Sequence, residues 1–254
     1  MFIGHYGVSL AAKRVDARLP LGWLFLAVQL PDILWAVLFL LGVEKARIIP
    51  AQTAVIAVDL YYIPYSHSLA ASLLWAAAIY AFVRLFPSGR AGLRKSTVAI
   101  VMALAVLSHF VLDIIVESNL PLYADTSKVG LGLANNPIVA YIVEGLILVA
   151  GLILYLRATT PKNLTGRYGM IVFVVVMLAF NLAMFGPPPT NLQVVAVSSL
   201  GSFAAMAGIA FWLDRQRRAS ILSRPPSRIL PRKRRWRSRR DEEAQDSTPS
   251  SGGG

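Results

Sequence analysis

A histidine and an aspartate, His109 and Asp113, stand four residues apart inside the apolar stretch 107–117. Four residues are about one turn of an α-helix, so both side chains are expected on one face of a helix, one above the other. An aspartate at the centre of a membrane-spanning helix costs about 2.5–3.5 kcal/mol. Such residues therefore tend to face the interior of a helix bundle and to form sites, proton relays or ion paths. The pair predicts a polar site, although two groups at this spacing could equally form a mutually satisfied structural contact.

Three further ionisable side chains lie in or beside apolar segments, at His5, Asp32 and His67. A helix rises about 1.5 Å per residue, which places Asp32 about 16 Å and His109 about 18 Å from the cytoplasmic ends of their predicted spans. His67 lies near the outer end of its own span, and His5 reaches about 12 Å if its helix enters from the cytoplasmic side. These heights overlap in the outer half of the membrane, so the residues are expected to form one cluster with Asp113.

Imidazole and carboxylate groups are ligands of zinc and similar divalent cations, and an open position on such an ion holds water for hydrolysis. A hydrolase also needs a general base, which another carboxylate can supply. The cluster therefore predicts a hydrolase-like membrane protein with an intramembrane metal site. In this hypothesis a divalent metal, with zinc favoured, is bound by His5, His67, His109 and Asp113, and Asp32 is the catalytic residue.

The same residues allow other interpretations. Asp32 follows Pro31, so its carboxylate could bond backbone groups that a proline kink leaves without partners. His67 could cap a helix. A transporter or channel-like protein would use the cluster to bind and relay a proton or cation. A non-catalytic membrane scaffold would keep these groups as structural contacts only.

The elements that must position these residues are long apolar segments. Of the 254 residues, 56% are hydrophobic and only 15% are charged, with mean hydropathy +0.59, whereas soluble domains carry about a quarter charged residues. We therefore predict an all-α polytopic membrane protein with six transmembrane helices, in residues 21–42, 66–86, 97–117, 138–156, 170–185 and 194–213. Residues 2–12 are too short to span and predict an N-terminal re-entrant or interfacial helix.

Basic residues are concentrated on one side of this predicted topology. Residues 215–254 hold twelve Lys or Arg and four acids, so we predict a membrane domain over 1–214 and a disordered cytoplasmic tail over 215–254. The positive-inside rule then places both termini in the cytoplasm and the chain in the cytoplasmic (inner) membrane. Anionic lipid is the expected partner of the tail, while nucleic acid is unlikely because the tail has one aromatic residue, Trp236. The chain has no cysteine.

Four short motifs, in order, resemble those of a family of membrane-bound, predicted metal-dependent hydrolases. That family has an early His, a Pro-Asp-x-Asp-His motif, a His-Arg-x-x-Thr-His-Ser motif and a Ser-His-x-x-x-Asp motif. The matching stretches are Gly4-His5, Pro31-Asp32, Ser66-His67-Ser68 and Ser108-His109 through Asp113. Other residues stand where the family has further ligands: Leu34, Trp35, Tyr62 and Ile63. The resemblance covers about residues 4–123 and implies metal-dependent hydrolysis of a small-molecule or lipid substrate.

The chain also resembles a divergent bacterial subgroup of multi-pass proteins to which no activity is attached. The stretches that carry this resemblance include Asp59, the sequence Tyr65-Ser66-His67-Ser68, and the sequence that starts at Lys128. The resemblance implies that Asp59 and Lys128 form an outer lid of the site. Tyr65 and Ser66 are further candidates for supporting residues. Glu144 is expected to have a structural role, paired with Lys128 or with neighbouring asparagines.

Overall fold

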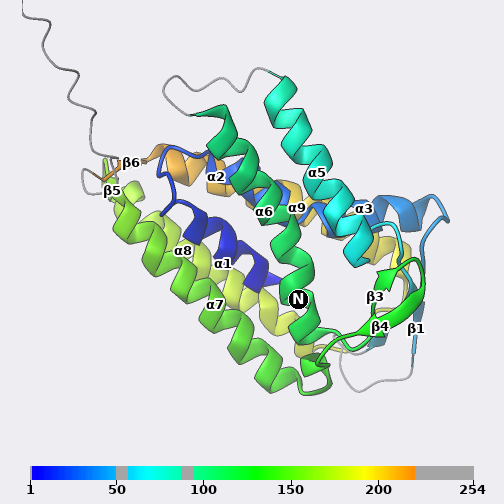
Figure 1. Cartoon of the computed structure of the whole chain (residues 1–254). Coiled ribbons are helices and arrows are strands. Elements are labelled where there is room, and N and C mark those ends of the chain that lie inside the picture. The colour runs from blue at the N-terminus through cyan, green and yellow to red at the C-terminus, as the bar shows by residue number, and fades with distance from the viewer. Residues whose placement is uncertain (1, 50–56, 87–93, 221–254) are drawn as a thin grey trace, which may run out of the picture. The chain divides into compact units, whose positions relative to one another are not determined.

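Helices make up most of the computed structural model, which describes residues 2–49, 57–86 and 94–220 (Figure 1). Most of the predicted basic tail, residues 221–254, lies outside the described residues. The first residues of that tail, 215–220, are part of the helical domain, because helix α9 and strand β6 extend through them.

Four helices in the described part of the chain are long and apolar enough to cross a membrane. They are α6 (Lys95–Val116), α7 (Pro137–Ala158), α8 (Leu164–Asn181) with its 3-10 extension η2 (Leu182–Phe185), and α9 (Leu192–Arg215). A fifth span is formed if α2 (Leu21–Val28) and α3 (Leu30–Leu40) count as one bent element. The prediction of six spanning helices is therefore wrong. The described residues form four helices that could span a membrane, or five if α2 and α3 are one span.

The predicted second span is shorter than expected. Helix α5 (Leu69–Leu85) has 17 residues, which corresponds to about 26 Å against a hydrocarbon core of about 30 Å. It begins at Leu69 because the Ser68 hydroxyl accepts the Ala71 N–H, 3.0 Å away, and so caps the helix. His67, expected in the first helical turn, therefore lies in the turn before α5.

The predicted first span is broken at Gln29, where α2 and α3 meet at 53°. Pro31 is the second residue of α3 and has no N–H group to bond the carbonyl four residues before it, which favours a break. The last carbonyls of α2 are consequently open to donors from other elements. The break also places Asp32 in the first turn of a new helix.

The N-terminal helix α1 (Ile3–Ala12) is buried inside the helical domain, mainly against α7 and also against α2 and α6. Its contact with α7 requires glycine, because a Cβ atom at Gly151 would overlap the Gly7 carbonyl and one at Gly7 would overlap the Ile147 carbonyl. The Glu144 carboxylate on α7 accepts the first backbone N–H groups of α1, those of Phe2 and Ile3, at 3.0 and 2.9 Å. Such a carboxylate satisfies donors that the start of a buried helix leaves open.

Among the described residues, three two-stranded antiparallel ladders join the helices, so the prediction of an all-α fold is corrected: the connections between helices contain short strands. They are β1 (Lys45–Ile48) with β2 (Val58–Tyr62), β3 (Leu120–Tyr123) with β4 (Thr126–Val129), and β5 (Thr159–Pro161) with β6 (Arg217–Ala219). Lys128 Nζ donates to the Tyr61 carbonyl at 3.3 Å and so links the first two ladders. The β5–β6 ladder lies beyond the other end of α7 (Figure 1).

A buried ion pair fixes the far end of α1. Lys13 Nζ lies 2.8 Å from Asp214 Oδ2 on α9 and donates to the Leu19 carbonyl at 2.6 Å. Tyr155 on α7 donates its hydroxyl to the other Asp214 oxygen at 3.2 Å. Between this pair and the start of α1 lies the largest apolar core, which includes Ile3, Tyr6, Leu10, Leu24, Phe25, Leu148, Met170 and Phe173.

Candidate metal centre

Five ionisable side chains from four segments meet beside the start of α1. His5 comes from α1, Asp32 from α3, His67 from the turn before α5, and His109 and Asp113 from α6. The His5 and His109 rings are stacked with centroids 3.9 Å apart, and the His67 ring centroid lies 5.3 Å from that of His109. The five residues predicted from the sequence to share a site are therefore brought together.

The two carboxylates face the Nε2 atoms of His67 and His109. Asp32 Oδ1 lies 3.2 Å from His67 Nε2 and 3.6 Å from His109 Nε2. Asp113 Oδ2 lies 3.1 Å from His109 Nε2 and 3.9 Å from His67 Nε2. A tetrahedral zinc ion with bonds of about 2.0–2.1 Å separates its ligand atoms by about 3.3–3.4 Å. The four nitrogen–oxygen distances are near this spacing, and the ligand atoms of Asp32, His67 and His109 all lie within 4.8 Å of one another.

The hydrogen bond of His109 identifies which ring nitrogen carries a proton. Nδ1 lies 2.7 Å from the Val28 carbonyl, which can only accept, so Nδ1 is the donor. In the neutral ring Nε2 then has a lone pair, and it accepts no hydrogen bond from any described residue. A buried lone pair that faces two carboxylates is stabilised only if a proton or a metal ion lies between them.

His67 is held by a chain of hydrogen bonds that starts at Glu44. The Ser66 hydroxyl donates to Glu44 Oε2 at 2.6 Å and lies 2.7 Å from His67 Nδ1. Glu44 follows α3 and is only 1% exposed. It is absent from the candidates predicted from the sequence, because an acid in a loop 22 residues before Ser66 gives no sign of that contact.

His5 lies at the edge of the cluster, where its ring contacts Asp113 and the backbone of His109 rather than both carboxylates. Its Nε2 lies 3.4 Å from Asp113 Oδ1 and 3.4 Å from the His109 carbonyl. Both are acceptors, so Nε2 carries a proton when no metal is bound and orients Asp113. With His109 and Asp113 it forms a second possible ligand triad beside that of Asp32, His67 and His109.

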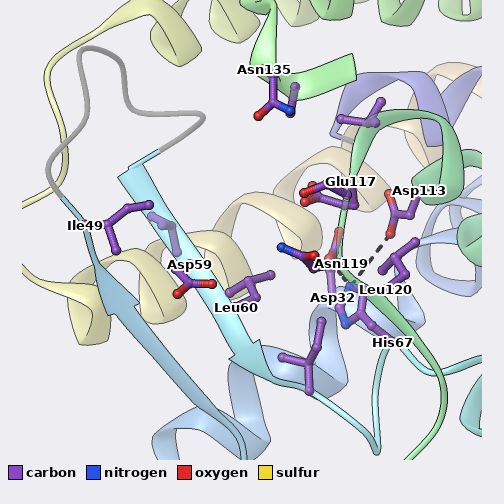
Figure 2. A pocket seen from close by; sticks show the side chains of 15 residues that line it. Asp32, Ile49, Asp59, Leu60, His67, Asp113, Glu117, Asn119, Leu120 and Asn135 are labelled. Carbon is purple, nitrogen blue, oxygen red and sulfur yellow. Dashed lines mark hydrogen bonds and ion pairs between the residues drawn. The ribbon is translucent and has the colours of Figure 1, made fainter. Parts of the chain in front are cut away.

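A cavity of about 310 Å³ opens onto the cluster. Asp32, His67 and Asp113 lie together at the cavity wall, and Asp59 projects from β2 apart from them (Figure 2). The rest of the lining includes Glu117, Asn119, Leu120 and Asn135, which follow α6 or precede α7. Burial raises the pKa of Glu117, just beyond the end of α6, and the nearby Asp113 carboxylate adds to this rise.

The five predicted supporting residues have different surroundings. Ser66 contacts a cluster histidine directly, as described. Asp59 accepts from Arg47 Nε at 2.8 Å, and Lys128 Nζ lies 3.1 Å from Asp125 Oδ1. Tyr65 is half exposed and contributes its backbone N–H to Glu44. Glu144 binds the start of α1 rather than Lys128 or an asparagine, so the predicted partners were wrong.

Comparison with known proteins places the second half of the chain in a family. The family model described as "Protein of unknown function (DUF2637)" matches residues 98–230, which include His109 and Asp113 but not the other three cluster residues. No curated protein and no solved structure matches the chain. The comparisons therefore give no support to the metal-dependent hydrolase family that the motifs resemble. Because the match covers more than half of its length, the chain belongs to the DUF2637 family.

Proposed function

We propose that this protein is a membrane-embedded hydrolase that depends on one divalent metal ion, with zinc favoured. One observation carries the proposal: Nε2 atoms of His67 and His109 face carboxylate oxygens of Asp32 and Asp113 at distances of 3.1–3.9 Å. This donor set is one that zinc uses in proteins. A cavity reaches it, so a small molecule has access to the site.

Each residue then has a separate role. His67, His109 and Asp113 bind the ion, which supplies Lewis-acid activation of water when bound. Asp32 is the general base, since it lines the cavity and its side chain is 22% exposed, whereas that of Asp113 is 3% exposed. His5 donates to Asp113 and keeps that carboxylate in position, as outer partners of metal ligands do.

A transporter is the less well supported alternative. Along α1, the side chains that follow His5 toward Lys13 include Leu10 of the largest apolar core and Ser9, whose hydroxyl is already bonded to the Leu24 carbonyl at 2.9 Å. Polar groups that relay an ion would have to continue through this layer. The cavity and the cluster thus fit a site that opens to one side.

We further propose that this opening faces the outside of the cytoplasmic membrane. The end of the helices that carries β5 and β6 holds most of the basic side chains, among them Arg14, Arg18, Arg157, Lys162, Arg167 and Arg215. The end that carries the cavity has Lys45, Arg47 and Lys128. By the positive-inside rule the first end is cytoplasmic, and substrate approaches from the outer leaflet.

The test is metal content together with hydrolysis. Protein purified in detergent through a tag without histidine is loaded with zinc, freed of excess ion and assayed by elemental analysis. We expect one zinc per chain, removal by chelator, and hydrolysis of p-nitrophenyl acetate that stops without zinc and returns with it. His109→Ala should lose both, and Asp16→Asn, distant from the cluster, should lose neither. Wild-type protein without stoichiometric zinc, or hydrolysis that persists without zinc, would overturn the proposal.

A further inference from the structure

We infer that Glu44 is a positioning residue of this site, which acts through Ser66 to fix the tautomer of His67. The inference rests on the proposed metal site, because it explains why His67 Nε2 is available as a ligand. Glu44 lies outside the residues that would touch the ion. Its effect passes through a single hydroxyl group.

Both oxygens of the Glu44 carboxylate accept hydrogen bonds from the turn that carries His67. Oε1 accepts the backbone N–H groups of Tyr65 and Ser66, each at 2.9 Å, and Oε2 accepts the Ser66 hydroxyl at 2.6 Å. The turn that carries His67 is therefore attached to the residue that follows α3. Because Glu44 and Ser66 are 1% and 0% exposed, water does not compete for these bonds.

The positions of the protons follow from counting donors. An ionised carboxylate only accepts, and a serine hydroxyl has one proton to donate. The Ser66 proton is directed at Glu44, so Ser66 Oγ can only accept from His67 Nδ1, 2.7 Å away. His67 then carries a proton on Nδ1. Its Nε2 lies 3.2 Å from Asp32 Oδ1, so in metal-free protein Nε2 donates to that carboxylate, and an ion would take the place of this second proton.

His109 reaches the same state through a different acceptor. Its Nδ1 donates to the Val28 carbonyl at the end of α2. Both rings are thus set by a partner on the side away from the proposed ion, which is the usual arrangement of metal-binding histidines. The acceptor of His109 is a backbone carbonyl, which mutation cannot change. The acceptor of His67 is the Ser66 hydroxyl, and a mutation of Glu44 can turn that hydroxyl into a donor.

Glu44→Gln should reverse the hydrogen-bond chain with almost no change in shape. The amide oxygen is expected to remain on the two backbone N–H groups, where an NH₂ group would face donors. The amide NH₂ then donates to Ser66 Oγ, and the Ser66 proton turns toward His67 Nδ1. His67 then carries a proton on Nε2 alone, and replacement of that proton by an ion would leave a ring with no proton, an anionic imidazolate, whereas the wild-type ring keeps its Nδ1 proton.

The experiment reads the tautomer directly in metal-free protein. The chain has three histidines, so protein labelled with ¹⁵N-histidine gives three ring spin systems in a long-range ¹H–¹⁵N correlation spectrum. The His67 signals are assigned from their loss in His67→Gln. We expect a proton on His67 Nδ1 in wild type, beside the Nε2 proton that faces Asp32, and a ring protonated on Nε2 alone in Glu44→Gln. An unchanged His67 tautomer in Glu44→Gln would overturn the inference.

A double-mutant cycle separates this effect from general damage to the turn. Outer partners of metal ligands contribute about 10–100-fold to metal affinity, so Glu44→Gln should weaken zinc binding by this amount. Ser66→Ala removes the hydroxyl that joins Glu44 to His67. In this background, adding Glu44→Gln should change zinc affinity by less than about 2-fold. Equal effects of Glu44→Gln in both backgrounds would contradict action through Ser66.

The matched control is Glu144→Gln, which replaces another buried carboxylate that accepts backbone N–H groups. It should leave the His67 tautomer unchanged. The spectrum also distinguishes failure of the inference from failure of the proposed function. If wild-type protein binds no zinc yet Glu44→Gln switches the tautomer, the tautomer control stands and the metal site falls. If wild-type protein binds zinc but Glu44→Gln leaves the His67 tautomer unchanged, the metal site stands and the inference about Glu44 is wrong.

Discussion

At the scale of single residues, the cluster is defined by which ring nitrogens face which carboxylate oxygens. His67 and His109 lie 5.3 Å apart by ring centroid, with their Nε2 atoms directed at the same two carboxylates. The sequence predicted these residues because ionisable groups in apolar segments need partners. It did not predict Glu44, since that contact joins a loop acid to a turn 22 residues later and leaves no periodic pattern.

Replacement of Asp32 separates its proposed role from that of the ligands. We expect Asp32→Asn to retain about one zinc per chain and to lose about 10²-fold or more in the rate of p-nitrophenyl acetate hydrolysis, because an amide cannot accept the proton. Elemental analysis and the ester assay on the same sample check this. Loss of zinc in Asp32→Asn would show that Asp32 is a ligand instead of the base.

At the scale of elements, apolar length predicted where the helices lie but not how they begin and break. Each of the six predicted segments contains a helix, yet residues 21–42 are split at Gln29 and α5 starts late at Leu69. The split depends on a missing N–H at Pro31, and the late start depends on the Ser68 cap. The β1–β2 and β3–β4 ladders escaped prediction because short strands in loops pair across distances that local patterns do not encode.

The position of α1 depends on its close contact with α7. Gly151→Ala places a Cβ atom against the Gly7 carbonyl, and such overpacking typically costs about 1–3 kcal/mol. We expect a lower melting temperature in detergent and a weaker contact of His5 with Asp113, seen as altered His5 ring signals. Gly208→Ala on α9 is the control, because its Cβ would meet nothing within 4 Å. Equal stability of the two variants would contradict the described packing.

The Lys13–Asp214 pair should stabilise the other end of α1. Lys13→Met leaves the Asp214 carboxylate without its cation in a buried position, which typically costs about 3–5 kcal/mol. Thermal unfolding in detergent measures the loss. Lys162→Met removes an exposed lysine near the same end and should have little effect. A Lys13→Met protein as stable as wild type would show that the pair contributes nothing.

At the scale of the whole molecule, the buried Lys13–Asp214 pair and the metal-site candidate lie at different depths of one helical domain. The first is beside the β5–β6 ladder, and the second opens toward the other two ladders. The distribution of Lys and Arg along the chain predicted an orientation for this arrangement. The cavity could not be predicted from the sequence, because it forms between a turn, a helix end and two hairpins that are distant along the chain.

The orientation is open to a direct labelling test, because the chain has no cysteine. Thr126 on β4 and Thr165 near the start of α8 are both exposed and lie at opposite ends of the helices. In intact cells a membrane-impermeant maleimide should label Thr126→Cys and not Thr165→Cys. After permeabilisation both should react. Labelling of Thr165→Cys alone in intact cells would reverse the proposed orientation.

In the proposed metal site, side chains from separate elements converge on one divalent ion. X-ray absorption spectroscopy of the zinc-loaded protein tests this most directly, because it counts imidazole ligands around the metal. We expect two imidazole nitrogens and at least one carboxylate oxygen at about 2.0–2.2 Å in wild type, and one imidazole in His67→Ala. A spectrum with oxygen ligands alone, or one that His67→Ala leaves unchanged, would contradict the proposed metal site.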